Sequence, residues 1–218
     1  MNTTTALKNW KIQPKDLFAT GPIVPVLVID KVADAVPIAE ALLEADVKVL
    51  EVTLRTPSAL DVISEIASKL PEALIGSGTV TTRQQLQQSI DAGAKFAISP
   101  GMTKDLLSAG NESEIALIPG ISSISELMDA VDYGYDHLKF FPAEASGGVN
   151  AIKSIGGPFP DIKFCPTGGI NINNVRDYLA LSNVACCGGS WLVPNDAVAN
   201  KNWPEITRLA KEALNFVK

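Results

Sequence analysis

Histidine and cysteine are scarce in this sequence. The chain has one histidine, His137, and three cysteines, Cys165, Cys186 and Cys187, none at metal-ligand spacing. Catalytic zinc sites usually take several ligands from histidine, and a disulfide framework takes cysteines in pairs. We therefore expect no metal site and no disulfides. The cysteines should be small reduced core residues, and His137 should be structural or exposed.

Basic charge is also scarce, and long apolar runs are missing. The 18 Lys and Arg residues are outnumbered by 24 Asp and Glu, which gives a net charge of -6. Binding to a nucleic-acid backbone needs a basic face, so we expect no nucleic-acid partner. No apolar stretch approaches the roughly 18 residues of a membrane span, and residues 1–5 lack the features of a targeting signal. The sequence predicts a cytoplasmic protein with no membrane partner.

No linker or low-complexity segment divides the chain, whose 46% hydrophobic content can fill a large core. Short β-branched runs alternate instead with longer helical patterns. We expect strands at 23–29, 49–55, 74–80, 96–100, 115–119, 138–143, 163–167 and 184–191. We expect helices near 33–45, 58–69, 82–92, 103–109, 123–132, 148–155, 173–181 and 203–217.

Strands separated by helical crossovers run parallel, and eight such pairs in succession favour a closed barrel. We therefore predict an α/β fold, a single (β/α)₈ TIM-barrel domain over residues 1–218. An extra amphipathic N-terminal helix should cover 6–20, and the barrel should cover 23–218. The alternative is a doubly wound sheet. Its dinucleotide-binding form needs a Gly-x-Gly-x-x-Gly turn after the first strand, and none follows Ile29.

One lysine interrupts an apolar strand. Lys139 lies between Leu138 and the pair Phe140 and Phe141. Burial disfavours the charged form of a lysine, and a neutral amine is a nucleophile that forms a Schiff base with a carbonyl. The non-catalytic alternative is a lysine at a strand end whose ammonium reaches water.

The strand at 49–55 supplies a carboxylate that can face this amine. Alternation places Glu51, Thr53 and Arg55 on one side and apolar residues on the other, so we expect the polar side to point into the barrel. Structural ion pairs are the alternative reading for Glu51 and Arg55. The strand at 74–80 brings the Thr79 hydroxyl toward the same end.

Glycine pairs follow the last two predicted strands. Gly168 and Gly169 end one turn, and Gly188 and Gly189 begin the other, followed by Ser190. Barrels frequently hold a phosphate at these two turns, because glycine lets backbone amides approach the oxygens. The alternative is that these glycines only form tight turns at the corners of the barrel and bind no ligand.

Five ordered motifs resemble the bacterial 2-keto-3-deoxy-6-phosphogluconate (KDPG) aldolases, which also act as 4-hydroxy-2-oxoglutarate (KHG) aldolases. The resemblance covers nearly the whole chain. The motifs are Val49-Leu-Glu-Val-Thr-Leu-Arg-Thr56, Gly76-Ser-Gly-Thr-Val80, Leu138-Lys-Phe-Phe-Pro-Ala-Glu144, Cys165-Pro-Thr-Gly-Gly-Ile170 and Gly188-Gly-Ser-Trp-Leu192. The resemblance implies a class I aldolase of the Entner-Doudoroff pathway that needs no cofactor, folds as a (β/α)₈ barrel and assembles as a homotrimer. One departure is Ser77, where alanine is more usual.

Carried over position by position, the resemblance makes Lys139 the Schiff-base lysine and Glu51 the general acid and base. Arg55 and Thr79 would hold the pyruvate carboxylate, and Phe141 would wall the pyruvate pocket.

The resemblance also implies roles at the other end of the substrate. Thr167 would influence stereochemistry at the carbon that bears the new hydroxyl. The phosphate would be bound by Gly168, Gly169, Gly189 and Ser190.

Two other functions fit part of this pattern. A phosphate-binding isomerase, or a barrel resembling thiamin-phosphate synthase, could use the same glycine turns. It would have no need of a buried lysine opposite a glutamate. A non-catalytic barrel that binds phosphorylated ligands would keep the glycines and have no use for Lys139 and Glu51.

Overall fold

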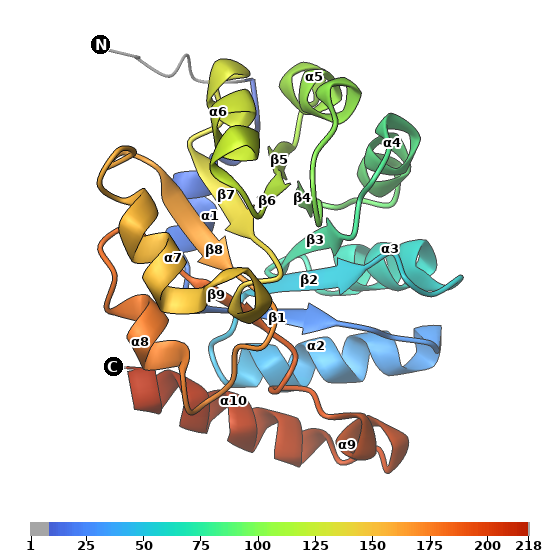
Figure 1. Ribbon diagram of the computed structural model, residues 1–218. Helices are drawn as coiled ribbons and strands as arrows, with labels where there is room; N and C mark the ends of the chain where they lie inside the picture. The colour runs from blue at the N-terminus through green and yellow to red at the C-terminus, as the bar shows by residue number, and fades with distance from the viewer. Residues whose placement is uncertain (1–8, 218) are drawn as a thin grey trace.

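The computed structural model describes residues 9–217, which form an α/β fold of parallel strands with helices around them (Figure 1). One sheet has the strand order β5-β4-β3-β2-β1-β9, and a second has the order β6-β7-β8. The strands are β1 (Ile23–Leu27), β2 (Val49–Thr53), β3 (Leu74–Gly78), β4 (Phe96–Ile98), β5 (Ala116–Ile118), β6 (Gly120–Ile121), β7 (His137–Phe140), β8 (Lys163–Pro166) and β9 (Cys187–Gly189).

The helices follow the strands in alternation, as the sequence predicts. They are α1 (Pro14–Ala19), α2 (Ala35–Glu44), α3 (Ala59–Lys69), α4 (Arg83–Asp91), α5 (Lys104–Glu112), α6 (Ile124–Asp132), α7 (Gly148–Ile155), α8 (Val175–Leu179), α9 (Asn195–Ala199) and α10 (Trp203–Val217), with 3-10 turns η1 (Val32–Asp34) and η2 (Glu144–Ser146). Each predicted strand and helix has a counterpart. The sequence did not predict α9 or the break at Pro119 between β5 and β6.

The prediction of a helix over 6–20 was wrong in extent. Residues 6–8 lie outside the described part of the chain, and α1 begins only at Pro14. Proline is well suited to the first turn of a helix and poorly suited to its interior, so the helix starts there. The preceding segment is held by other means, because the Trp10 indole donates to the carbonyl of Gly110 over 2.8 Å.

Helix α1 covers one end of the strands. Leu17 and Phe18 are buried in a cluster with residues of several strands and the residue before β9: Val24, Val49, Phe96, Ile98, Ile118, Cys165 and Cys186. Burying two such side chains contributes about 2 kcal/mol each. The end of the strands opposite the functional loops is therefore packed with apolar groups.

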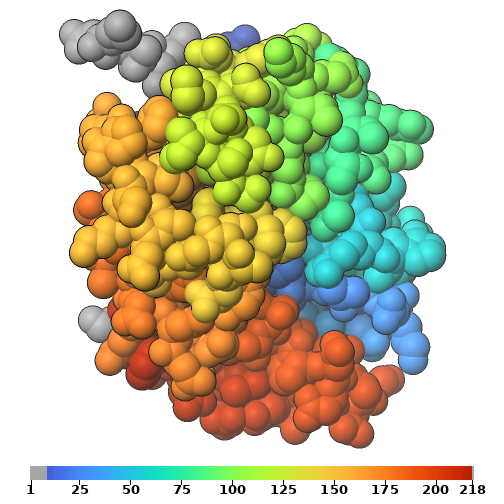
Figure 2. Space-filling view, viewed as in Figure 1, coloured from blue at the N-terminus to red at the C-terminus, as the bar shows by residue number. Residues whose placement is uncertain are grey.

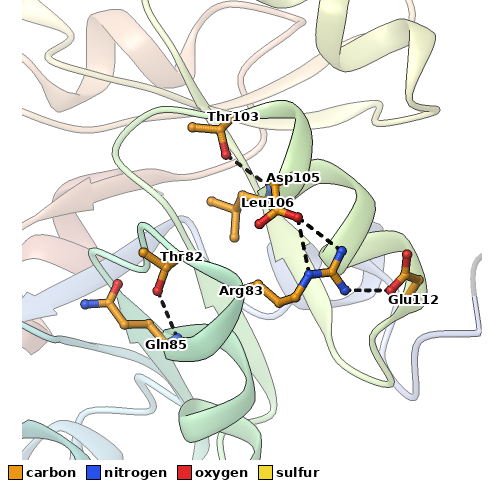
Figure 3. A network of polar contacts seen from close by, with 7 residues as sticks. All are labelled: Thr82, Arg83, Gln85, Thr103, Asp105, Leu106 and Glu112. Carbon is orange, nitrogen blue, oxygen red and sulfur yellow. Dashed lines mark hydrogen bonds and ion pairs between the residues drawn. The ribbon is translucent and has the colours of Figure 1, made fainter.

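The outer helices are joined to each other as well as to the strands. The side chains of Thr82 and Thr103 cap α4 and α5 by accepting from the amides of Gln85 and Leu106. Arg83 at the start of α4 reaches the neighbouring helix (Figure 3), where it contacts Asp105 over 3.4 Å and Glu112 over 2.6 Å. These ion pairs are exposed, so each contributes at most about 1 kcal/mol. They fix the relative position of two helices rather than the core.

Segments far apart in the sequence meet on one face of the molecule. Figure 2 shows parts coloured blue, cyan, yellow and orange coming together there. Parallel strands place their carboxyl ends at one edge, so the loops that follow β1, β2, β7 and β9 converge. Among residues 9–217, no helix is both long enough and apolar enough to cross a membrane.

Candidate active site

A buried ion pair lies at the centre of the site. Lys139 on β7 places its Nζ 3.2 Å from Oε1 of Glu51 on β2, although 88 residues separate them in the sequence. Lys139 is 5% exposed and Glu51 is 1% exposed. The Lys139 ammonium also lies 5.4 Å from the centre of the Phe141 ring. The predicted facing of amine and carboxylate is thus present in the fold, with both groups withdrawn from water.

A glycine that the sequence analysis did not single out makes room for this pair. Gly78 ends β3, and a Cβ atom at that position would overlap the Glu51 carboxylate. The strand register places Gly76 beside Glu51 and Gly78 beside Thr53. The alternating glycines of Gly76-Ser77-Gly78 could have revealed this, because glycine within a strand often marks a close approach.

A pocket of about 360 Å³ opens beside Lys139. It contains every predicted site residue except Glu51, which lies beneath it in contact with Lys139. The lining residues are Val26, Thr53, Arg55, Thr79, Pro100, Lys139, Phe141, Thr167, Gly168, Gly169, Ile170, Gly188, Gly189 and Ser190. The sequence analysis gave no role to Val26, Pro100 or Ile170, which carry only apolar side chains.

Arg55 reaches this pocket by a different route from the predicted one. Strand β2 ends at Thr53, so Arg55 lies in a turn rather than on the alternating face of a strand. Its amide donates to the carbonyl of Thr53 over 2.8 Å, which closes a three-residue turn directly after the strand. Its Nε then donates to the Thr53 hydroxyl over 3.1 Å. A local turn, not strand alternation, therefore brings the guanidinium to the same side as Glu51.

Thr79 lies beside this turn in an unusual backbone conformation. The amide of Leu54 donates to the carbonyl of Gly78 over 2.8 Å, which continues the β2–β3 pairing to the residue before Thr79. Thr79 has φ of 60°, in the left-handed region. A β-branched residue is a genuine outlier there, and such strain concentrates at functional sites. Arg55 and Thr79 are thus neighbours at one end of the pocket.

The glycine turn after β8 is held against the chain that follows β7. The amides of Ala143 and Glu144 donate to the carbonyls of Thr167 and Gly168 over 2.8 and 3.1 Å. Gly168 and Gly169 have φ of 102° and 80°, and a Cβ at Gly169 would overlap the side chain of Glu144. Glycine is therefore needed here for packing, whether or not a ligand approaches.

Thr167 lines the pocket, and its hydroxyl is buried against Gly188 without a hydrogen-bond partner among residues 9–217. Its residue is 6% exposed, and its Oγ1 has no hydrogen-bond partner within the described structure. A buried polar group of this kind costs roughly 1–3 kcal/mol unless something satisfies it. Rotation of the side chain away from Gly188 would bring this hydroxyl to a ligand in the pocket.

A second cavity adjoins the first. Its volume is about 460 Å³, and it shares Val26 and Ser190 with the pocket around Lys139. Lys31 and Lys201 contribute ammonium groups to it, and both side chains are exposed. Ser190 therefore stands at the junction of two hollows rather than at a closed end.

The remaining candidate groups do not line the pocket around Lys139. The three cysteines are buried free thiols, and burial raises the pKa of both Cys186 and Cys187. Such thiols are poor nucleophiles. His137 begins β7 and places its Nδ1 2.7 Å from Asp136, with its ring against Phe18. No three His, Cys, Asp or Glu side chains within residues 9–217 gather to hold a metal ion.

Comparison with known proteins gives concordant matches. The family model described as "KDPG and KHG aldolase" matches residues 15–209. The 2-dehydro-3-deoxy-phosphogluconate aldolase of Pseudoalteromonas atlantica is 64% identical, with 95% of this chain and 96% of that protein covered. The KHG/KDPG aldolase of Escherichia coli is 55% identical, with 97% and 100% covered.

Solved structures agree with this picture. KDPG aldolase from Legionella pneumophila, with pyruvate captured at low pH as a covalent carbinolamine intermediate, is 53% identical with a TM-score of 0.93, covering 94% of this chain and all of that one (100%). The Zymomonas mobilis enzyme with 3-phosphoglycerate is 45% identical, with a TM-score of 0.86 and 92% and 94% covered. Thiamine phosphate pyrophosphorylase from Pyrococcus furiosus matches with a TM-score of 0.66 at 18% identity, which is a likeness of fold alone.

Proposed function

The chain belongs to the KDPG and KHG aldolase family, and from that premise we propose that it is a class I aldolase. It cleaves 2-dehydro-3-deoxy-6-phosphogluconate to pyruvate and glyceraldehyde 3-phosphate in the Entner-Doudoroff pathway. It also cleaves 4-hydroxy-2-oxoglutarate to pyruvate and glyoxylate. The single observation that carries this proposal is the buried contact of 3.2 Å between Lys139 Nζ and Glu51 Oε1 beside an open pocket.

Lys139 is the nucleophile of this reaction. Its neutral amine attacks the C2 carbonyl of the 2-oxo acid to give a carbinolamine, which loses water to form an iminium. The iminium then accepts the electron pair of the C3–C4 bond when that bond breaks, leaving an enamine. Protonation of the enamine at C3 and addition of water to the restored iminium release pyruvate and the free lysine.

Glu51 moves the protons. The carboxylate lies within hydrogen-bond reach of the amine, so it accepts a proton from Lys139 as the carbinolamine forms and passes it to the carbinolamine hydroxyl, which departs as water. It later removes the proton of the C4 hydroxyl, directly or through the released water, and the aldehyde departs. The same group returns a proton to C3 of the enamine. Burial of Glu51 keeps bulk water from competing in these steps.

The two ends of the pocket suit the two ends of the substrate. Arg55 and Thr79 bind the pyruvate carboxylate, and the planar guanidinium donates two parallel hydrogen bonds to it. Phe141 forms a wall of the pyruvate site. This assignment is supported by the position of all three residues in the pocket that contains Lys139.

At the other end, the Thr167 hydroxyl contacts the substrate near C4 and influences stereochemistry there. The phosphate is bound by backbone and hydroxyl groups of two turns: Gly168, Gly169, Gly189 and Ser190. Support comes from the pocket itself, because Thr167 and all four of these residues line it together with Lys139.

We also propose that residues 1–218 form one domain, in which residues 23–218 make a closed (β/α)₈ barrel and α1 is an extra helix before it. Support comes from contacts that link the two sheets. Parallel bridges join Phe164 to Val184 and Thr167 to Gly188, between β8 and the β9 segment. On the other side, the amide of Lys139 donates to Pro119 between β5 and β6 over 2.9 Å.

The family resemblance leads us to propose a homotrimer. On the surface of α6, Ile124 and Met128 are 43% and 56% exposed and lie one helical turn apart. Two large apolar side chains on one exposed face suit a contact with a second copy of the chain.

Borohydride trapping tests the aldolase proposal. With pyruvate present, reduction should convert the iminium to a stable secondary amine and add a pyruvyl mass to the peptide that contains Lys139. Lys139→Met should show neither adduct nor cleavage of either substrate. Lys163→Met is the matched control. Lys163 lies on the next strand, its ammonium group donates a hydrogen bond to the Ser182 carbonyl, and the residue does not line the pocket. An adduct at another lysine, or none, would overturn the assignment.

Chelation provides a second test. Treatment with EDTA should leave cleavage intact, because the proposed electron sink is the iminium and not a metal ion. A phosphate-binding isomerase or a non-catalytic barrel would give no pyruvate adduct at all, so trapping also separates these alternatives.

A further inference from the structure

We propose that Thr53 is a positioning residue, which determines the edge of the Arg55 guanidinium that faces the substrate carboxylate. This inference rests on the proposed aldolase function. Thr53 is the last residue of β2 and is 2% exposed, and its hydroxyl lies between a backbone acceptor and a side-chain donor. It donates to the carbonyl of Leu27 over 3.0 Å and accepts from Arg55 Nε over 3.1 Å.

The backbone sets the direction of these two hydrogen bonds. The Leu27 carbonyl can only accept, so the Thr53 hydroxyl proton points toward it. The oxygen lone pairs then face Arg55, which can only donate. Leu27 ends β1 and pairs with Val52, so the carbonyl that accepts from Thr53 is part of the sheet itself. A serine could make the same two bonds, and a valine of the same shape could make neither.

Arg55 needs Thr53 as an anchor because nothing else in the described structure holds its side chain. The residue is exposed, and it follows a turn rather than lying within the strand. An arginine side chain loses roughly 2 kcal/mol of rotamer freedom when it is fixed in one geometry. With the anchor in place, much of this ordering is complete before the substrate arrives.

The anchor also selects the binding edge. With Nε bonded to Thr53, Nη1 and Nη2 have no partner among residues 9–217 and remain for the carboxylate. We infer an end-on contact of these two nitrogens with the two carboxylate oxygens. Without Thr53, the guanidinium could also present its Nε edge or turn into solvent, and the C2 carbonyl would be held less well against Lys139.

Exchange of the pyruvate methyl protons in deuterated water tests the inference. The iminium loses a C3 proton to become the enamine and regains a deuteron, so the exchange reports pyruvate binding without an aldehyde partner. Proton NMR measures its rate against pyruvate concentration. In Thr53→Val, we expect the half-saturating concentration to rise about tenfold, the scale of one hydrogen bond to a charged group. The maximal rate should change less, because the lost contact orients the substrate and takes no part in proton transfer.

Two further variants separate positioning from folding. Thr53→Ser keeps both hydrogen bonds and should behave nearly as the unchanged protein. In an Arg55→Met background, adding Thr53→Val should cause no further loss, because the residue that it positions is gone. The inference is overturned if Thr53→Val binds pyruvate normally, or if its full effect persists without Arg55. If the unchanged protein showed no exchange, the proposed function itself would fail instead.

Discussion

Thr79 is strained in the fold, and glycine at this position should make the protein more stable and less active. Its φ of 60° lies in the left-handed region, where its branched side chain is crowded against its own backbone. No other requirement of the turn calls for threonine. We therefore expect the variant Thr79→Gly to adopt the same fold without backbone strain at this residue and to lose the hydroxyl that the carboxylate would contact.

The size of the stability gain follows from two opposing effects. Relief of left-handed strain contributes roughly 1–2 kcal/mol. The greater freedom of glycine in the unfolded chain offsets about 0.4–1 kcal/mol of it. A net gain of about 0.5–1 kcal/mol should raise the midpoint of thermal unfolding by roughly 1–4 °C in a chain of this length. Loss of one hydrogen bond to a charged carboxylate should lower kcat/KM about tenfold.

Two measurements on the same preparations check this reasoning. Thermal or urea unfolding gives the stability, and a coupled assay of pyruvate release gives kcat/KM for both substrates. Thr79→Ser is the control, because it keeps the hydroxyl and a Cβ and should remain active with little gain in stability. If Thr79→Gly proved less stable than the unchanged protein, the backbone strain argued here would be absent. If it kept full kcat/KM, the hydroxyl would have no part in binding.

Three other changes test separate parts of the structure. Ser77→Ala should stabilise the protein by about 1 kcal/mol in urea unfolding and leave kcat unchanged. The reason is that the Ser77 hydroxyl is buried without a partner among the described residues, on the side of β3 that faces away from Glu51. A loss of stability would show that this hydroxyl makes a hydrogen bond. Burial tends to raise the pKa of Glu126, but hydrogen bonds from Ser122 and Ser123 outweigh it and lower that pKa below 4.5. The stability that this carboxylate contributes is therefore present above about pH 4.5 and lost as pH falls through the lower folded pKa. Glu126→Gln should be less stable than the unchanged protein at about pH 7, and the difference should shrink as pH falls through that pKa; a constant difference would contradict this. Met128→Lys should weaken the proposed trimer in sedimentation velocity, whereas an unchanged trimer would place the contact elsewhere.

The sequence by itself determined the order of strands and helices and the chemical character of the site. Alternating apolar runs report burial directly, so each predicted strand appeared at nearly the predicted place. An isolated lysine in such a run is costly unless a partner is provided, which is why Lys139 could be singled out without a structure. The scarcity of histidine likewise pointed away from zinc before any geometry was known.

Only the tertiary structure decided which groups touch. The distance from Lys139 to Glu51 depends on how β2 and β7 are brought across the molecule, and no local pattern encodes it. The space for the Glu51 carboxylate is supplied by Gly78 of a third strand. Arg55 reaches the pocket through a turn that strand alternation misdescribed, and the left-handed backbone of Thr79 has no signal in its residue type. Residue types follow from burial and propensity, which are local, whereas contacts follow from the packing of distant elements.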